Sequence, residues 1–154
     1  MKIREATEND IAQIQVVRNL VKENVLSDPS KVTDEICRDY LLKRGKGWVC
    51  EFERRIVGFA IADLVDNNVW ALFIDPEFEN RGIGKLLHQL MMDWYFSNDK
   101  TFAWLSTEKN TRAEMFYRMN GWVEAGDYGK IEVKLMMHRE IWLKKKDNNS
   151  IVPF

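Results

Sequence analysis

Residues 69–87 read Val69-Trp-Ala-Leu-Phe-Ile-Asp-Pro-Glu-Phe-Glu-Asn-Arg-Gly-Ile-Gly-Lys-Leu-Leu87. The stretch from Val69 to Ile74 is apolar and β-prone, which is typical of a buried strand. Pro76 lacks an N–H donor and restricts Asp75, so the predicted strand ends there. Apolar residues at helical spacing then predict a helix over about residues 82–97. These residues are Ile83, Leu86, Leu87, Leu90, Met91, Trp94 and Tyr95.

The turn between this strand and helix, Asn80 to Lys85, has the properties of an anion site. Its glycines let the backbone approach a ligand closely. The helix start adds N–H groups without intrahelical partners and a partial positive charge, which suit a phosphate or pyrophosphate. A nucleotide P-loop does not match because Leu86 follows Lys85, and a dinucleotide fingerprint does not match because Leu87 occupies its third glycine position. A plain turn that needs glycine stays the alternative.

These residues resemble the acyl-CoA-binding motif of the GNAT superfamily of N-acetyltransferases, Gln/Arg-x-x-Gly-x-Gly/Ala after a strand. Residues 79–84 match its spacing, with Glu79 at the first position. A second stretch, residues 110–122, resembles the family's Asn-x-x-Ala-x-x-Phe/Tyr-Tyr-x-x-x-Gly-Phe motif, with Trp122 at the last position. Because both motifs occur in the expected order and at the expected separation, the chain is identified as a member of this superfamily.

The rest of the chain is consistent with that fold. We expect an opening strand over residues 1–6 and a helix from Ile11 to about Val25 that Ser27 to Ser30 ends, followed by further elements. These are a helix capped by Thr33 and ending before Gly45, strands over 48–52, 56–64 and 101–106, a short helix that Gly121 ends, and strands from Trp122 and over 132–142. Gly58 indicates a bulge or close packing.

The predicted class is α/β. The strand, helix and strand between residues 69 and 106 indicate a parallel pair with a right-handed crossover. The resemblance implies a single-domain GNAT-like fold: a mixed central β-sheet with antiparallel N-terminal strands, a splayed parallel pair, and helices on both faces. The domain is expected over residues 1–143, with a flexible C-terminal tail over 144–154.

Composition excludes several kinds of protein. With 154 residues the chain suits one domain with a sizeable core, and its net charge of −1 without a basic stripe argues against nucleic acid as a partner. No apolar run reaches the roughly 20 residues that span a bilayer, so no membrane association is expected. Cys37 and Cys50 show no metal or redox spacing and favour a reducing cytoplasm. With His88 and His138 as the only histidines, no metal site is expected.

The resemblance implies an acetyl-CoA-dependent N-acetyltransferase, in which a primary amine attacks the thioester directly within a ternary complex. The main chain of Leu72, Phe73 and Ile74 would pair with the pantetheine arm, and a main-chain N–H at Phe73 or Ile74 would stabilise the developing oxyanion. Asn110 would bond the arm, and Tyr117 would protonate the departing thiolate. The pyrophosphate would be held by Asn80, Arg81, Gly82, Ile83, Gly84 and Lys85.

The sequence leaves several points open. The acceptor is a small-molecule or peptide amine, and it must lose a proton before attack. Four carboxylates near strand ends are candidate bases, or turn and surface residues if ordered water takes the proton: Asp63, Asp66, Asp75 and Glu108.

Aromatic residues either line an acceptor pocket or belong to the core: Tyr40, Trp48, Trp70, Phe78 and Tyr128. His88 is expected on the polar side of its helix and His138 on a strand surface, and neither is expected to be catalytic. A domain that senses acyl-CoA without transfer is the alternative function, and a homodimer is left open.

Overall fold

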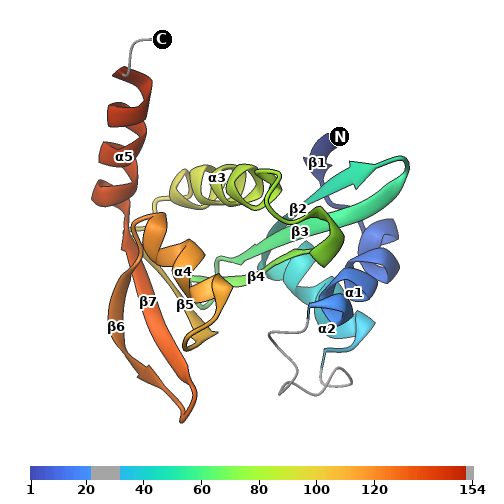
Figure 1. Ribbon diagram of the computed structural model, residues 1–154, viewed down its shortest axis with the longest axis horizontal. Coiled ribbons are helices and arrows are strands. Elements are labelled where there is room, and N and C mark those ends of the chain that lie inside the picture. The colour runs from blue at the N-terminus through green and yellow to red at the C-terminus, as the bar shows by residue number, and fades with distance from the viewer. Residues whose placement is uncertain (22–31, 152–154) are drawn as a thin grey trace. The chain divides into compact units, whose positions relative to one another are not determined.

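The computed structural model describes residues 1–21 and 32–151, with side chains described up to residue 147. The chain forms two compact units, Met1–Tyr95 and Phe96–Phe154. The expectation of one domain over residues 1–143 stays a prediction. The predicted α/β class is confirmed, because helices are interspersed among the strands along the described chain (Figure 1). Within the described part, no helix has the length and apolar character needed to cross a membrane.

The first unit contains an antiparallel sheet in the order β1, β2, β3, β4. Its strands are β1 (Lys2–Glu5), β2 (Gly45–Phe52), β3 (Arg55–Asp63) and β4 (Asn68–Ile74). The predicted hairpin is present: Glu53 and Arg54 both have positive φ, 50° and 66°, as a tight turn between twisted strands requires. The antiparallel N-terminal strands are thereby confirmed.

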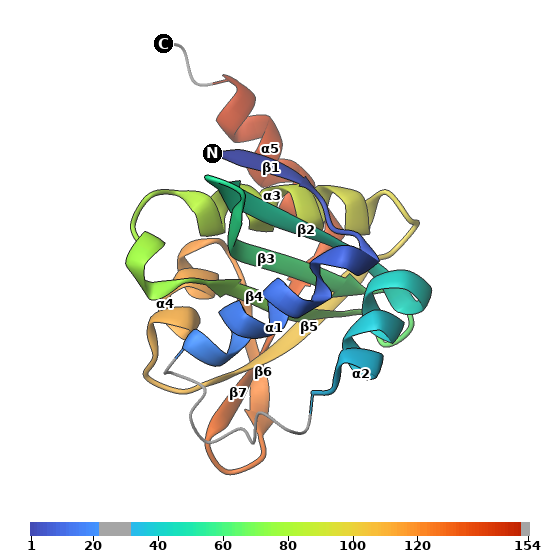
Figure 2. The same ribbon diagram turned by 90° about the vertical axis from the view of Figure 1, so that its right-hand side faces the viewer.

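Helices cover both faces of this sheet, as predicted (Figures 1 and 2). One face carries α1 (Ile11–Leu20) and α2 (Asp34–Asp39), and the other carries α3 (Ile83–Phe96). The core on the α1 side is built around Phe59 and Ile61 of β3, with Ile11, Ile14, Val17, Cys37, Leu41, Val49, Ile56 and Ala71.

The first helix is shorter than predicted. It ends at Leu20, because Val21 has an extended backbone (φ −83°, ψ 108°). The predicted break at Ser27 to Ser30 lies outside the described residues. For α2 the predicted cap is confirmed: the Thr33 side chain accepts a hydrogen bond from the Ile36 N–H.

On the opposite face, α3 packs closely against β3 at Gly58. A Cβ at Gly58 would lie 2.8 Å from Cδ1 of Ile74 and 3.3 Å from Cγ2 of Ile83, so the predicted close packing is confirmed. The expected apolar face of α3 is partly wrong. Leu86 and Leu90 are exposed, while His88, expected on the polar side, is buried. The buried side chains follow Ile83 mainly at four-residue spacing, which turns the inward face away from Leu86 and Leu90.

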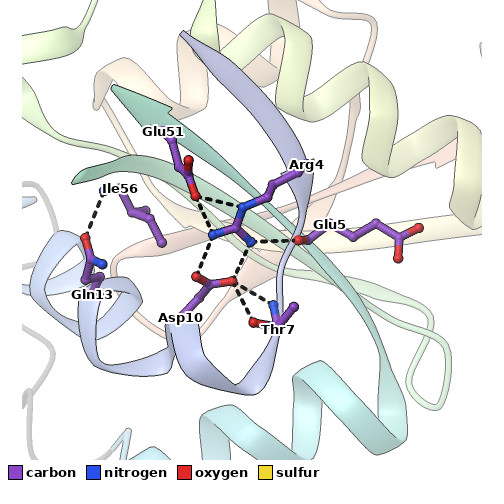
Figure 3. Close-up of polar contacts among 7 residues, drawn as sticks. All are labelled: Arg4, Glu5, Thr7, Asp10, Gln13, Glu51 and Ile56. Atoms are coloured by element: carbon purple, nitrogen blue, oxygen red, sulfur yellow. Dashed lines mark hydrogen bonds and ion pairs between the residues drawn. The ribbon is translucent and has the colours of Figure 1, made fainter. Parts of the chain in front are cut away.

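An arginine network ties β1 to the start of α1 (Figure 3). Arg4 donates to both carboxylate oxygens of Asp10 at 2.8 Å and to Glu51 of β2. Asp10 also accepts from the Thr7 N–H at 2.7 Å. These hydrogen bonds, the one from Arg4 first, outweigh desolvation and lower the pKa of Asp10.

The second unit contains an antiparallel sheet in the order β5, β7, β6, with two helices. Its elements are β5 (Phe102–Glu108), α4 (Arg112–Met119), β6 (Val123–Tyr128), β7 (Glu132–His138) and α5 (Arg139–Ile151). The short helix ended by Gly121 is confirmed, since Gly121, the residue after the C-cap Asn120, has φ 95°.

The last strand is shorter than predicted. β7 ends at His138, and the predicted strand residues 139–142 open α5 instead. The Arg139 N–H donates to the Thr101 carbonyl at 2.9 Å. Trp142, which lies on α5, has a buried side chain. Arg139 and Glu140, and the residues 143–146 that follow, are good helix formers, which explains the change of structure. Residues 144–151 continue α5, so the segment expected as a tail is helical, and its flexibility stays a prediction.

Candidate functional site

In the first unit, the predicted cofactor strand ends where expected. Leu72, Phe73 and Ile74 close β4 and pair with Ala60, Phe59 and Gly58 of β3. All three side chains are only partly buried, unlike Ala71 before them.

The turn after β4 is held by its own side chains. The Asp75 carboxylate accepts from the Glu77 N–H at 2.9 Å and lies 3.5 Å from Arg55, which fixes a short 3-10 turn over Pro76–Phe78. The chain then bends through Asn80 at φ 62° and Gly82 at φ 82°. Left-handed backbone favours glycine and asparagine, which explains these residue types.

Gly82 stands at the start of α3. Its carbonyl accepts from the Leu86 N–H at 3.1 Å, which closes the first helical turn. The N–H groups of Ile83, Gly84 and Lys85 therefore belong to the first turn, where no intrahelical partner exists. A Cβ added at Gly82 would meet nothing within 4 Å, so the backbone there is open to a ligand.

Charges around this turn are mixed. The Arg81 guanidinium lies over the Phe78 ring at 4.8 Å, and Arg55 lies over the same ring at 5.2 Å. Arg81 and Lys85 are exposed, and the carboxylates of residues 75, 77 and 79 stand nearby in sequence. Since these charges largely offset each other, the helix start and its amides are the main electrostatic attraction for an anion.

In the second unit, Asn110 is an exposed turn residue with φ 63° that leads into α4. Its N–H donates to the Glu114 carboxylate at 2.7 Å. Thr111 caps the helix, accepting from the Glu114 N–H at 3.2 Å and donating to the Glu108 carbonyl at 2.7 Å. The backbone of Asn110 is thus fixed by the helix start.

Tyr117 is buried near the C-terminal end of α4. Its ring makes edge contacts with Phe116 and Trp122, at 5.5 and 5.7 Å between centroids. The Trp122 N–H donates to the Tyr117 carbonyl, and the Gly121 N–H to the Arg118 carbonyl, which together form a Schellman motif. Burial raises the pKa of Tyr117, so its hydroxyl keeps its proton at neutral pH.

The candidate bases differ in how firmly they are engaged. Asp63 is fully buried and accepts two bonds from Arg44 and two main-chain bonds. Asp66 is exposed and pairs with Arg44 at 2.7 Å. Glu108 ends β5, where it is paired in register with Glu132 of β7. Within the described residues, no group of three or more His, Cys, Asp or Glu side chains is placed to hold a metal ion.

The candidate pocket aromatics separate into two groups. Trp48 and Phe78 are buried, whereas Tyr128 is exposed and packs on Trp104 at 5.7 Å. The Tyr40 and Trp70 rings stack in parallel, 4.1 Å apart, and both are partly buried against the α1-side core. Trp70 belongs to β4, so this stacked pair lies on the same strand as the segment Leu72 to Ile74.

The sequence analysis missed Arg18. Its guanidinium lies over the rings of Trp70 at 4.6 Å, Phe73 at 5.0 Å and Phe59 at 5.6 Å. The signal was present, because Ile11, Ile14 and Arg18 have the spacing of one helix face. An arginine on an apolar face is unusual, and here its Nε and Nη2 atoms are shielded from solvent.

Solved structures of acetyltransferases share this fold. The chain is similar to the PaiA N-acetyltransferase of Thermoplasma acidophilum in complex with coenzyme A, at 16% identity and a TM-score of 0.70 over 89% of this chain and 98% of that one. It is also similar to a ribosomal-protein-alanine N-acetyltransferase from Brucella melitensis, at 16% identity and a TM-score of 0.67 over 90% of this chain and 99% of that one. A third similar structure is a Bacillus anthracis protein described as a streptothricin acetyltransferase, in complex with acetyl coenzyme A. Its identity is 18% and its TM-score 0.67, over 89% of this chain and 98% of that one.

At these identities the likeness shows the fold. No curated protein sequence matches the chain significantly. The model of the acetyltransferase (GNAT) family, however, matches residues 14–122, which is well over half of the chain and contains both motifs. Fold, motifs and family model agree, and the chain therefore belongs to the GNAT family and is an acyltransferase.

Proposed function

We propose that this protein is an N-acetyltransferase that moves an acetyl group from acetyl-CoA to a primary amine, which attacks directly within a ternary complex. The observation that carries this proposal is the open backbone at Gly82, where a left-handed turn leads into the first turn of α3. The acceptor is a small-molecule or peptide amine.

Cofactor binding is assigned to the residues that the resemblance to the family implies. The amides of Asn80 to Lys85 hold the pyrophosphate, which suits helix-start N–H groups. The main chain at the end of β4, Leu72 to Ile74, pairs with the pantetheine arm, and Asn110 adds a side-chain bond. When bound, acetyl-CoA supplies an activated acetyl thioester. Similar structures with coenzyme A and acetyl coenzyme A support this choice of donor.

Proton transfer is assigned to Tyr117 on the leaving side. Tyr117 Oη is the proton donor that we assign to the departing thiolate, and burial, which raises its pKa, keeps the hydroxyl protonated at neutral pH before transfer. On the amine side we assign no side-chain base. Asp63 and Asp75 are engaged in the structural contacts described above, which supports loss of the amine proton through solvent. A main-chain N–H at Phe73 or Ile74 stabilises the thioester oxygen.

We also place the protein in the cytoplasm. Cys37 and Cys50 are both free thiols and both buried, which fits a reducing compartment.

The test measures acetyl-CoA binding by thermal shift and transfer by release of free CoA thiol. At about 100 times Kd, a ligand that binds only the folded state adds about 2.7 kcal/mol of stability. For a chain of this length that raises Tm by roughly 5–10 °C. If neither acetyl-CoA nor any other short acyl-CoA shifts Tm, the proposal is refuted. A shift in Tm without thiol release on a panel of amines would identify a domain that senses acyl-CoA without transfer.

Gly82→Leu should abolish the shift, with Gly129→Leu as the matched control. Both glycines have positive φ, 82° and 67°, and neither has an atom within 4 Å of an added Cβ. The backbone strain is therefore similar, and only the change at Gly82 obstructs the proposed pyrophosphate site.

A further inference from the structure

Arg18 is a partly buried cation, and two of its guanidinium donors lack partners. Its Nε and Nη2 atoms are shielded from solvent and have no hydrogen-bond partner in the structure, whose description covers residues 1–21 and 32–151. Three aromatic rings surround the guanidinium, and burial lowers the pKa of Arg18. Aromatic faces attract a cation but accept no conventional hydrogen bond from its N–H edge, so the cost of desolvating these donors is not offset.

Other buried or partly buried arginines of the same unit are paired. Arg4 is held by Asp10 and Glu51 (Figure 3). Arg44 binds Asp63 with Nε at 3.2 Å and Nη2 at 2.9 Å, one bond to each carboxylate oxygen. Arg18 lacks partners at the same two atoms, Nε and Nη2, which form one edge of the guanidinium. That edge matches a carboxylate, as Arg44 demonstrates within this molecule.

We propose that Arg18 binds a carboxylate of the acceptor substrate, so that the acceptor is an amine that also carries a carboxylate, such as an amino acid. This rests on the proposed function, because Phe73, whose ring lies 5.0 Å from the guanidinium, belongs to the β4 segment assigned to the cofactor arm. A carboxylate on Arg18 therefore anchors the acceptor beside the strand that presents the thioester.

A second polar atom supports an acceptor of this kind. Oε1 of Gln15 is also buried without a partner among the described residues, while its Nε2 donates to the Val32 carbonyl at 2.6 Å. That donation fixes the orientation of the amide, so the free atom is an acceptor. Gln15 and Arg18 are three residues apart on α1 and hence on neighbouring positions of one side. Together they offer donors to a carboxylate and an acceptor to an N–H group.

The experiment compares the common L-amino acids with their C-terminal amides. The members of each pair differ in the carboxylate, and kcat/KM is compared per uncharged amine because amidation also lowers the pKa of the α-amine. Thiol release with acetyl-CoA gives kcat/KM, and calorimetry gives binding of each compound without turnover. A charged hydrogen-bonded pair is worth a factor of roughly 10–100 in binding. We expect the wild type to favour acids by that factor, chiefly through KM, and Arg18→Met to lose the preference.

Two further variants separate substrate binding from structure. Lys46→Gln removes a cation that also lies over a ring, Trp94 at 5.6 Å, but is paired with Glu5, and it should keep the acid preference. Arg18→Met should leave the ligand-free Tm unchanged or higher, because it removes unpaired buried donors. Arg18→Lys keeps a charge without the planar edge and should retain only part of the preference.

The outcomes are distinct from those for acetyl transfer. Equal use or equal binding of acids and amides by the wild type would overturn the carboxylate assignment, as would an acid preference that survives Arg18→Met. If acetyl-CoA binds but no amine releases thiol, the transferase proposal fails, and calorimetry still decides about Arg18. Absence of any carboxylate binding, or a large fall in ligand-free Tm for Arg18→Met, would identify a structural cation instead.

Discussion

Asp63→Asn tests whether this buried carboxylate is a base or an anchor. Each oxygen of Asp63 accepts one N–H from Arg44 and one from the main chain: Oδ1 from Nε and the Val65 N–H, Oδ2 from Nη2 and the Asp66 N–H. An asparagine NH₂ group must therefore face two donors, whichever way its amide is turned. The variant loses a charged and a main-chain hydrogen bond, and leaves Arg44 without its buried counter-charge.

The expected cost follows from these contacts. A hydrogen bond to a charged group contributes about 1.5–3 kcal/mol and a neutral one about 1 kcal/mol, so we expect a loss of roughly 2.5–4 kcal/mol. For a chain of this size that lowers Tm by roughly 5–15 °C. Urea unfolding followed by tryptophan fluorescence measures the free energy, with the slope m as a check on two-state behaviour.

Asp66→Asn is the matched control, because Asp66 pairs with the same Arg44 at 2.7 Å but is 62% exposed. An exposed pair contributes about 0–1 kcal/mol, so the control should change little. Turnover per folded molecule should be retained in both variants. An Asp63→Asn protein that is as stable as the wild type but inactive, with an altered pH profile, would refute the reasoning and identify a base.

Three further variants test other contacts. Gly58→Val should cost about 1–3 kcal/mol in urea unfolding through overpacking against Ile74, and a neutral result would contradict the close approach. Tyr117→Phe should lower kcat with acetyl-CoA affinity retained. Because the folded pKa of Tyr117 lies above the unfolded value of about 10, stability should fall above pH 10, and this variant should flatten that fall in Tm scans. Asp10→Asn should remove stability that the lowered pKa of Asp10 supplies above about pH 4, so its Tm should vary less between pH 5 and 3; an unchanged acid profile would rule out the Arg4 pairing as the cause.

Local signals were sufficient to predict most elements of the fold. The Thr33 hydroxyl caps a helix, and Pro76, which lacks an N–H donor, follows the end of β4. Gly121, which tolerates positive φ, ends α4. The boundary between β7 and α5 was missed because neither glycine nor proline marks it. Glu132 to Met137 alternate, and Ile141 and Trp142 extend the apolar pattern into what is a helix.

The parts of the candidate site that depend on local backbone conformation could be predicted from the sequence. The parts that depend on side-chain packing between elements could not. The turn at Asn80 and Gly82 follows from residue types that tolerate positive φ. The setting of Arg18 depends instead on which rings from β3 and β4 converge on α1, and no spacing along the chain gives that. In the same way, burial of His88 was missed because the inward face of α3 depends on the sheet beneath it.

The two caps of α4 determine how the Tyr117 side chain is oriented. A helix of eight residues is about 12 Å long and would not persist alone in water. The orientation of Tyr117 therefore depends on the caps at Thr111 and Gly121, which hold the two ends of the helix. With the proton-donor role proposed for Tyr117, substitutions at Thr111 or Gly121 should lower turnover by changing the orientation of the Tyr117 side chain.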